Sequence, residues 1–370
     1  MIPRFLLAAA AALLLAPNVR AADAPAPLKP IADHLWTYTH AKEHSKSVVA
    51  EFGSFLAVIE SPGDEAAARA MLDSLAVAFP DKSVRFLLHT HHHGHSLAAI
   101  DPWLARDVTL VTAPDNIDVV RGRSANPERF ERAVLRATEG LAIGDGLNSM
   151  VLHVIEKDDY PVPTDQYTVI EFPRQKMLVS GCLYTKPLTY HGVVNTRKTS
   201  LRDFMAEHLS GVEWLVNTSS CEARGDEDVS SLATFRASLE QGLRPEEVAA
   251  RLQGMSLEEI DAALPALTAE LTARTDRSYD LLVCANHLRR EVKDLPRAEK
   301  LFGLTAAAFP DDADAAFYLG MARLEMGEDA ACQTAWDRCL ELCDGSEERA
   351  DWEESMASTR ARVAKMRAEG

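Results

Sequence analysis

Five histidines lie within a stretch of seven residues, at positions 89, 91, 92, 93 and 95. A neutral imidazole binds zinc or copper well, and alternate residues of an extended segment point to the same side. We therefore predict that His91, His93 and His95 are metal ligands. Histidine runs also occur as surface or tag-like tracts, but such tracts do not lie at a transition from a strand to a helix, where this one is expected.

The elements that would position these histidines follow from the hydrophobic pattern. Residues 84–88 predict a buried strand directly before the cluster, and residues 97–105 predict a short helix interrupted by Pro102. Further strands are expected over residues 35–38, 47–51, 55–60, 108–112, 150–155, 167–172, 176–180 and 214–217, and further helices over 64–79, 126–137 and 201–209. This alternation predicts an α/β fold that ends near a charged stretch at residues 222–228.

From Leu232 the chain is predicted to be almost wholly helical, and it contains an internal repeat. Ala298, Phe302 and Pro310 recur 34 residues later as Cys332, Trp336 and Asp344. This period resembles the tetratricopeptide repeat. Because two units cannot stand alone, we expect them to pack on helices within residues 232–274 and to be capped by a helix over 347–366. We also expect a protein or peptide partner to bind through these helices.

The first 22 residues have the pattern of a secretory signal peptide. Arg4 supplies a positive charge, residues 5–16 are apolar, and residues 19–21 offer a cleavage site with small residues. The mature protein is therefore expected to be secreted or periplasmic.

The bulk composition excludes some partners. A net charge of −17 argues against binding to nucleic acid or to an anionic membrane. No segment after the leader is long and apolar enough to predict a membrane span. Six cysteines are too few for a disulfide scaffold in a chain of this length, so we interpret Cys332, Cys339 and Cys343 as buried apolar residues of one helix.

The order of these elements resembles the metallo-β-lactamase superfamily, in which a strand ends in Thr-His-x-His-x-Asp-His. Residues 90–93 match the start of that motif, and residues 51–53 and 60–62 match Glu-Phe-Gly and Glu-x-Pro in the first hairpin of some members. The resemblance covers roughly residues 34–222. It implies an αββα sandwich of two facing mixed sheets over residues 23–224, followed by an all-α helical repeat domain over residues 225–370.

Carried over residue by residue, the resemblance gives an altered two-metal site. His91 and His93 match the first two ligands, whereas His95 stands at the Asp position and Ser96 at the next His position. The later ligands are all replaced: Pro163 falls at the third His, Cys182 at the bridging Asp, and Ser219 at the last His. His153 and His191 are two further histidines that could replace a lost ligand, although His153 is more simply interpreted as an ordinary half-buried residue.

The chemical consequence of these changes is large. A two-metal hydrolase needs five or six ligands to hold two ions about 3.5–4 Å apart. A histidine at 95 and a deprotonated thiol at 182 can still bind metal, so His91, His93, His95 and Cys182 could make one rearranged zinc or copper site. We expect at most one ion per chain. Three nitrogens and one sulfur suit tetrahedral zinc, but they would leave no open position for water.

Three functions stay open at this point. The first is an exported metallo-β-lactamase-like protein with at most one metal ion and without two-metal hydrolysis. The second is an active zinc-dependent hydrolase of an ester, amide or thioester that uses the rearranged site. The third is a periplasmic binding or scaffold protein that acts through its helical repeats. The sequence assigns no catalytic and no substrate-binding residue.

Overall fold

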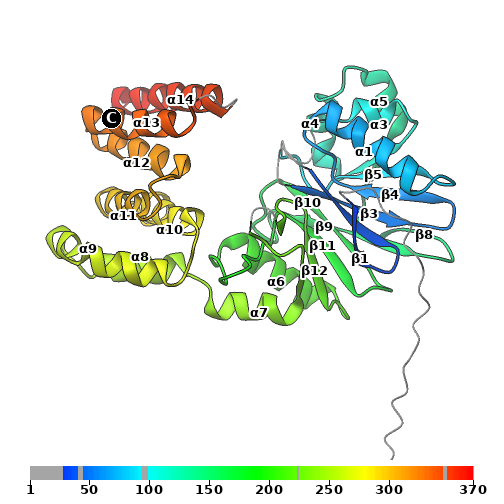
Figure 1. The fold of residues 1–370 in the computed structure, drawn as a ribbon, viewed down its shortest axis with the longest axis horizontal. Coiled ribbons are helices and arrows are strands. Elements are labelled where there is room, and N and C mark those ends of the chain that lie inside the picture. Colours follow the sequence, from blue (N-terminus) through cyan, green and yellow to red (C-terminus); the bar gives the residue numbers. More distant parts are fainter. Residues whose placement is uncertain (1–27, 41–44, 94–98, 223–224, 345–347, 370) are drawn as a thin grey trace, which may run out of the picture.

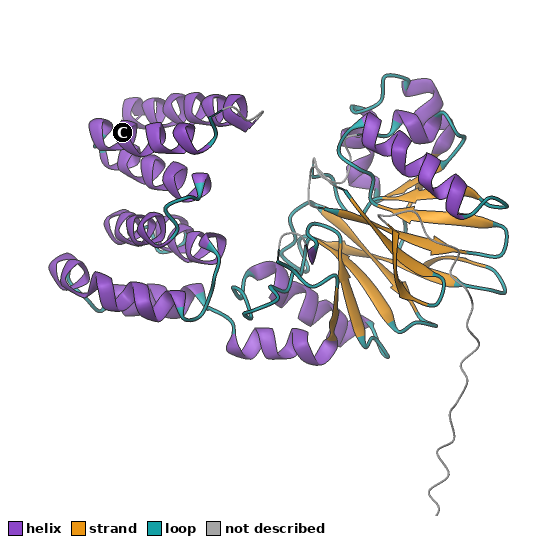
Figure 2. Cartoon of the chain, in the orientation of Figure 1, coloured by secondary structure: helices purple, strands orange, loops and turns teal. Residues whose placement is uncertain are grey.

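Two β-sheets lie face to face in the first part of the chain, and a stack of helices follows (Figures 1 and 2). This arrangement is seen in a computed structural model that describes residues 28–40, 45–93, 99–222, 225–344 and 348–369. The predicted signal peptide lies outside the described residues. Helices cover the outer face of each sheet, so the expected αββα sandwich is confirmed.

The first sheet contains seven strands in the order of the chain. They are β1 (Leu28–Ala32), β2 (Leu35–Thr39), β3 (Lys46–Glu51), β4 (Phe55–Ile59), β5 (Ser83–Leu88), β6 (Thr109–Thr112) and β7 (Val134–Arg136). Strands β1 to β4 are antiparallel, and β4 to β7 are parallel. Helices α1 (Glu65–Ala78), α3 (Asp101–Leu104), α4 (Ile117–Arg121) and α5 (Pro127–Ala133) follow the parallel strands or connect them.

Alternation along the strands divides the apolar side chains between two cores. Val49 and Val58 pack with helix residues such as Met71 of α1. Their neighbours Val48 and Ile59 instead pack against residues of the second sheet. Successive side chains of a strand point to opposite faces, so each strand contributes to both cores and is buried on both faces.

The second sheet contains six strands in the order β13-β12-β11-β10-β9-β8. They are β8 (Leu141–Gly144), β9 (Ser149–Glu156), β10 (Gln166–Phe172), β11 (Met177–Gly181), β12 (Trp214–Asn217) and β13 (Val229–Ser231). Only β11 and β12 pair in parallel among these strands. Helices α6 (Thr196–His208) and α7 (Leu232–Gln241) pack their apolar side chains on the outer face.

The structure differs from the sequence expectations at two boundaries. The helix expected over residues 126–137 ends at Ala133, because residues 134–136 pair with β6 as a short edge strand. The sandwich also continues past residue 224, since β13 pairs with β12 and Phe235 of α7 is buried with the second-sheet core. We therefore divide the chain after α7.

The second part of the chain is a stack of helices. These are α8 (Pro245–Gln253), α9 (Leu257–Thr272), α10 (Ser278–Arg290), α11 (Leu295–Ala308), α12 (Ala313–Met326), α13 (Asp329–Leu342) and α14 (Glu348–Glu369). Helices α11 and α13 begin and end 34 residues apart, so their bounds follow the period seen in the sequence. The repeated positions Phe302 and Trp336 are both fully buried.

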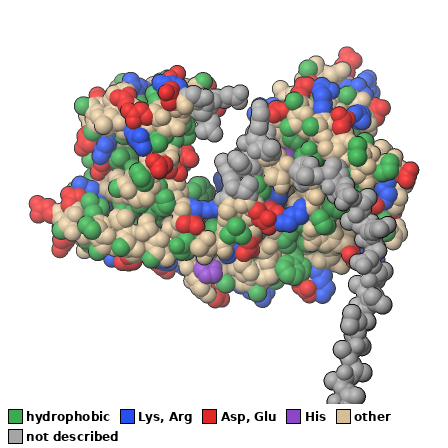
Figure 3. Space-filling model, viewed as in Figure 1, with side chains coloured by type: hydrophobic (Ala, Val, Ile, Leu, Met, Phe, Trp, Pro, Cys, Tyr) green, Lys and Arg blue, Asp and Glu red, His purple; other side chains and the backbone are tan. Residues whose placement is uncertain are grey.

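The helical stack stands beside the sandwich, and α7 leads into it (Figure 1). Acidic and basic side chains are interspersed over the visible face of both parts (Figure 3). Among the helices that the structure describes, none has the length and apolar character needed to cross a membrane.

Candidate metal centre

Three of the four predicted ligands meet where the two sheets open toward the helical stack. His91 and His93 follow β5 of the first sheet, and Cys182 follows β11 of the second. Each offers one ligand atom, and these three atoms lie within 4.8 Å of one another. The fourth predicted ligand, His95, lies outside the described residues, as does Ser96.

His91 is held from several sides in the interior. Its ring stacks on the ring of Tyr167, with centroids 4.9 Å apart and planes at 17°. Its Nδ1 atom lies 2.6 Å from the Thr90 hydroxyl, which in turn donates to the carboxylate of Glu60. The same carboxylate accepts a 3.1 Å bond from the Thr90 backbone N–H. Contacts of this kind fix the orientation of a histidine ligand and its tautomer.

Cys182 is positioned by the glycine before it. Gly181 has φ +58°, and a Cβ atom there would lie 2.0 Å from the Tyr167 hydroxyl and 2.6 Å from the Thr90 hydroxyl. The close approach lets the Cys182 backbone N–H donate to the Tyr167 hydroxyl at 2.7 Å. One tyrosine thereby contacts both His91 and Cys182, so it couples the two sheets at the centre.

The thiol of Cys182 contacts two nitrogen-bearing side chains. Its Sγ atom lies 3.9 Å from Nδ1 of His93 and 3.8 Å from Nη1 of Arg197. Burial raises the pKa of the Cys182 thiol, and the positive charge of Arg197 offsets part of that rise. Burial also lowers the pKa of His93, and Arg197 and His92 lower it further. His93 is therefore neutral at pH 7, which is the form that binds a metal.

The donor set fits a transition metal such as zinc. Imidazole nitrogen and thiolate sulfur are ligands that zinc and copper both take, and tetrahedral zinc bonds of about 2.0–2.3 Å place ligand atoms about 3.3–3.8 Å apart. The observed spread of up to 4.8 Å is close enough for side-chain rotations to complete that arrangement. Loss of the thiol proton would accompany binding, because the thiolate is the ligand form.

The other carried-over positions do not join this group. Pro163 has no ligand atom in its side chain, and Ser219 lines the same cleft as Cys182 but offers only a hydroxyl. His153 has its two ring nitrogens 2.8 Å from Glu139 and 3.1 Å from Glu171, so it is engaged within the sandwich, and it is buried rather than half-buried as expected. His191 is also outside the His-His-Cys group.

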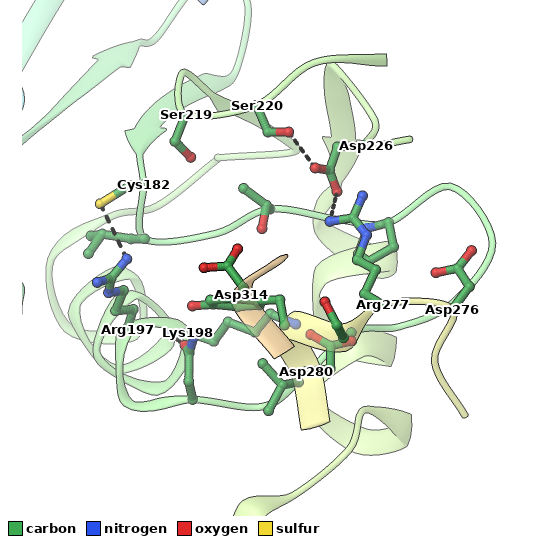
Figure 4. Close-up of a pocket in the computed structure, with 18 of the residues that line it drawn as sticks. Cys182, Arg197, Lys198, Ser219, Ser220, Asp226, Asp276, Arg277, Asp280 and Asp314 are labelled. Atoms are coloured by element: carbon green, nitrogen blue, oxygen red, sulfur yellow. Dashed lines mark hydrogen bonds and ion pairs between the residues drawn. The ribbon is translucent and has the colours of Figure 1, made fainter. Parts of the chain in front are cut away.

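A cleft of about 520 Å³ opens from Cys182 toward the helical stack (Figure 4). The sandwich contributes Arg197 and Lys198 from the first turn of α6, and the stack contributes Asp276, Arg277 and Tyr279 around the start of α10. Sequence reasoning missed this shared wall. No spacing rule links residues about 80 positions apart, and both segments look like ordinary polar helix starts.

The comparisons with known proteins return metallo-β-lactamases among solved structures. The chain resembles a metallo-β-lactamase from Pontibacter korlensis (TM-score 0.46, 16% identity) over 58% of this chain and 96% of that one. It resembles FIM-1 from Pseudomonas aeruginosa in its mono-zinc form (0.44, 16%) over 58% and 92%. It also resembles the enzyme from Erythrobacter litoralis with β-mercaptoethanol in the active site (0.45, 13%) over 58% and 94%.

At these identities the likeness does not extend to substrate or activity. No protein-family model matches the chain, and no curated protein matches it in sequence.

Proposed function

We propose that this chain is a metallo-β-lactamase-like protein that binds at most one zinc ion through His91, His93 and Cys182. The observation that carries the proposal is the convergence of two imidazoles and one thiol, from two different sheets, within 4.8 Å. The neutral state of His93 and the buried cradle of His91 favour the same interpretation.

The proposal includes the loss of two-metal hydrolysis. A second ion needs its own oxygen and nitrogen ligands about 3.5–4 Å from the first. The Asp and the last His that the resemblance implies for it are replaced by His95 and Ser219 in this chain. Among the described residues, the His-His-Cys group is the single set of three potential ligands that lies close enough together.

Position 95 separates a hydrolase from a binding protein. If His95 completes the coordination, the ion has four protein ligands and the site is of the closed, structural kind. If His95 is not a ligand, one coordination position has no protein ligand and the site is of the open kind. A zinc ion in an open site acts as a Lewis acid on a carbonyl or phosphoryl oxygen. In that case Arg197, which contacts Cys182, is placed to attract an anionic part of a substrate.

The experiment is elemental analysis of the dialysed full chain, alone and as the His95→Gln variant. One zinc per chain in both proteins supports an open site, whereas loss of zinc in the variant supports a closed one. The matched control is His92→Gln, because His92 is the neighbouring histidine and its Nδ1 contacts Asn116, 2.6 Å away. Two ions per chain in the wild type, or none after incubation with zinc, would refute the proposal.

A second candidate function is partner binding by the helical part. The 34-residue offset of α11 and α13 supports a tetratricopeptide-like assignment. Ser278 and Asp312, also 34 residues apart, are joined by a 2.7 Å hydrogen bond, and Gly320 lets Trp336 approach closely. Crosslinking in the native host tests this role. Recovery of one partner protein crosslinked to residues of α10 to α13 supports this role. Recovery of no crosslinked partner from folded chain opposes it.

We further propose that the protein is exported, on the basis of the leader-like pattern in residues 1–22. N-terminal sequencing of protein from the native host should find a start near Ala22. Recovery of the intact leader on soluble cytoplasmic protein would refute export.

A further inference from the structure

The cleft beside the candidate metal centre has two walls of different origin. One wall belongs to the sandwich and carries Arg197 and Lys198, and the other belongs to the helical stack and carries Asp276 and Arg277 (Figure 4). Its volume of about 520 Å³ is in the range of cavities that bind small ligands. The stack is therefore part of the candidate site.

Most charged groups of the cleft are already engaged within the protein. Arg277 forms an ion pair with Asp226 at 2.8 Å, and Lys198 donates to the backbone carbonyl of His191 at 3.1 Å. Asp280 accepts a 2.7 Å bond from the Thr275 hydroxyl. Asp312 caps α12 through one carboxylate oxygen and accepts from Ser278 through the other. These groups build the walls of the cleft.

Two charged side chains of the cleft differ from these. Among the described residues, neither Arg197 nor Asp276 forms an ion pair, and Arg197 makes its polar contact with the thiol of Cys182. Figure 4 shows the two at opposite ends of the cavity, with Arg197 beside Cys182 and Asp276 beyond Arg277. The cleft therefore has a positive end at the metal centre and a negative end at the helical stack.

We propose that this cleft binds a short peptide as a zwitterion, with its carboxylate at Arg197 and its protonated amine at Asp276. Opposite charges at the two ends orient such a ligand, because reversing it would place like charges together. Leu183, Val193 and Phe309 also line the cleft and supply apolar surface for small side chains. The inference rests on the proposed function only in that the carboxyl end is the one presented to the metal.

The test combines changes in the ligand with changes in the protein. The probe is a tripeptide of three L-alanines, used with its N-acetylated form and its C-terminal amide. Binding to the zinc-free full chain is measured by titration calorimetry. For the wild type, we expect each modification to weaken binding about 5-fold, the size expected for one partly exposed charge pair.

The variants assign each effect to one residue. In Asp276→Asn, N-acetylation should no longer weaken binding, while amidation still does. In Arg197→Gln the pattern should be reversed. Asp311→Asn is the matched control, since Asp311 is an exposed aspartate near the stack that pairs with Arg338 outside the cleft, and it should behave as the wild type.

Each outcome bears on one claim. The inference is supported if N-acetylation loses its effect in Asp276→Asn and amidation loses its effect in Arg197→Gln. Absence of binding at millimolar peptide, or binding that is insensitive to both modifications, overturns it. Because the titration uses zinc-free protein, a chain that binds the peptide in this way but takes up no zinc would refute the proposed metal function and leave this inference standing.

Discussion

The two sheets contribute unequally to the candidate metal centre. The first sheet supplies His91 and His93, which keep the residue types of the metallo-β-lactamase motif, in a loop held by Thr90 and Glu60. The second sheet supplies Cys182, while Pro163 and Ser219 stand where the resemblance implies further ligands. The two sheets differ in that the first offers two histidines that match the motif, whereas the second offers a thiol where the resemblance implies a carboxylate. Under the proposed function, the site would hold one ion rather than two.

The largest loss of zinc affinity is expected from the ligands that the first sheet supplies. His91→Ala should lower zinc affinity by more than ~100-fold, because losing a ligand costs more than losing the ~10–100-fold contribution of a residue that only supports one. Competition with a chelator of known affinity measures it. Affinity within a few-fold of wild type would show that the first sheet does not hold the ion.

The next largest loss of zinc affinity is expected from Cys182, the ligand that the second sheet supplies. Cys182→Ser is expected to weaken zinc binding by about 100-fold, less than His91→Ala, since the serine hydroxyl is a weaker ligand than the thiolate but leaves one oxygen donor in its place. In the wild type, zinc should slow alkylation of Cys182, as mapped by mass spectrometry, while the rate at the buried Cys221 stays unchanged. Equal alkylation of Cys182 with and without zinc would remove the second sheet from the site.

A smaller loss of zinc affinity is expected from Gly181, which lets Tyr167 contact both His91 and Cys182. In Gly181→Ala, the new Cβ would meet the Tyr167 hydroxyl at 2.0 Å, so the tyrosine that stacks on His91 must move. We expect a loss of about 2–4 kcal/mol in the free energy of unfolding and of about 10-fold in zinc affinity.

Gly320→Ala is the matched control for that variant. Its Cβ would meet Trp336 at 2.3 Å inside the helical stack, so stability should fall while zinc affinity stays unchanged. Urea unfolding and chelator competition give the two quantities. Equal losses of zinc affinity in both variants would show that Gly181 acts through stability alone.

The smallest effect is expected at the histidine outside the group. His153→Gln should leave zinc affinity within about 2-fold of wild type, because its ring nitrogens already contact Glu139 and Glu171. The same chelator competition measures it. A loss comparable with that of Cys182→Ser would mean that His153 rotates into the site when metal binds.

The sequence predicted the long strands of the two sheets but not the short edge strands. The strand before the histidines and the strand before Cys182 were both predicted, because apolar runs of this length have few other structures available. Short edge strands such as β7, β8 and β13 were missed, since three or four residues carry little pattern and their pairing depends on the neighbouring strand.

The site was predictable only in its motif-bearing part. His91, His93 and Cys182 could be placed through the resemblance, whereas Arg197 and Asp276 could not, because their roles depend on how the helical stack sits against α6. That placement depends on contacts such as the bridge between Val193 and Leu243, with Val193 buried in the core of the stack, and local sequence does not encode them. The charged stretch at residues 222–228 predicted a domain boundary, but β13 and α7, which follow it, still pack with the second sheet. Their pairing and packing depend on distant residues, which local sequence does not encode.

The most direct test of one zinc ion held by His91, His93 and Cys182 is X-ray absorption at the zinc edge of the zinc-loaded full chain. We expect a sulfur neighbour at about 2.3 Å and nitrogen neighbours at about 2.0 Å, with no second metal at about 3.5–4 Å. A spectrum with only oxygen and nitrogen neighbours, or with a metal–metal distance in that range, would contradict this expectation.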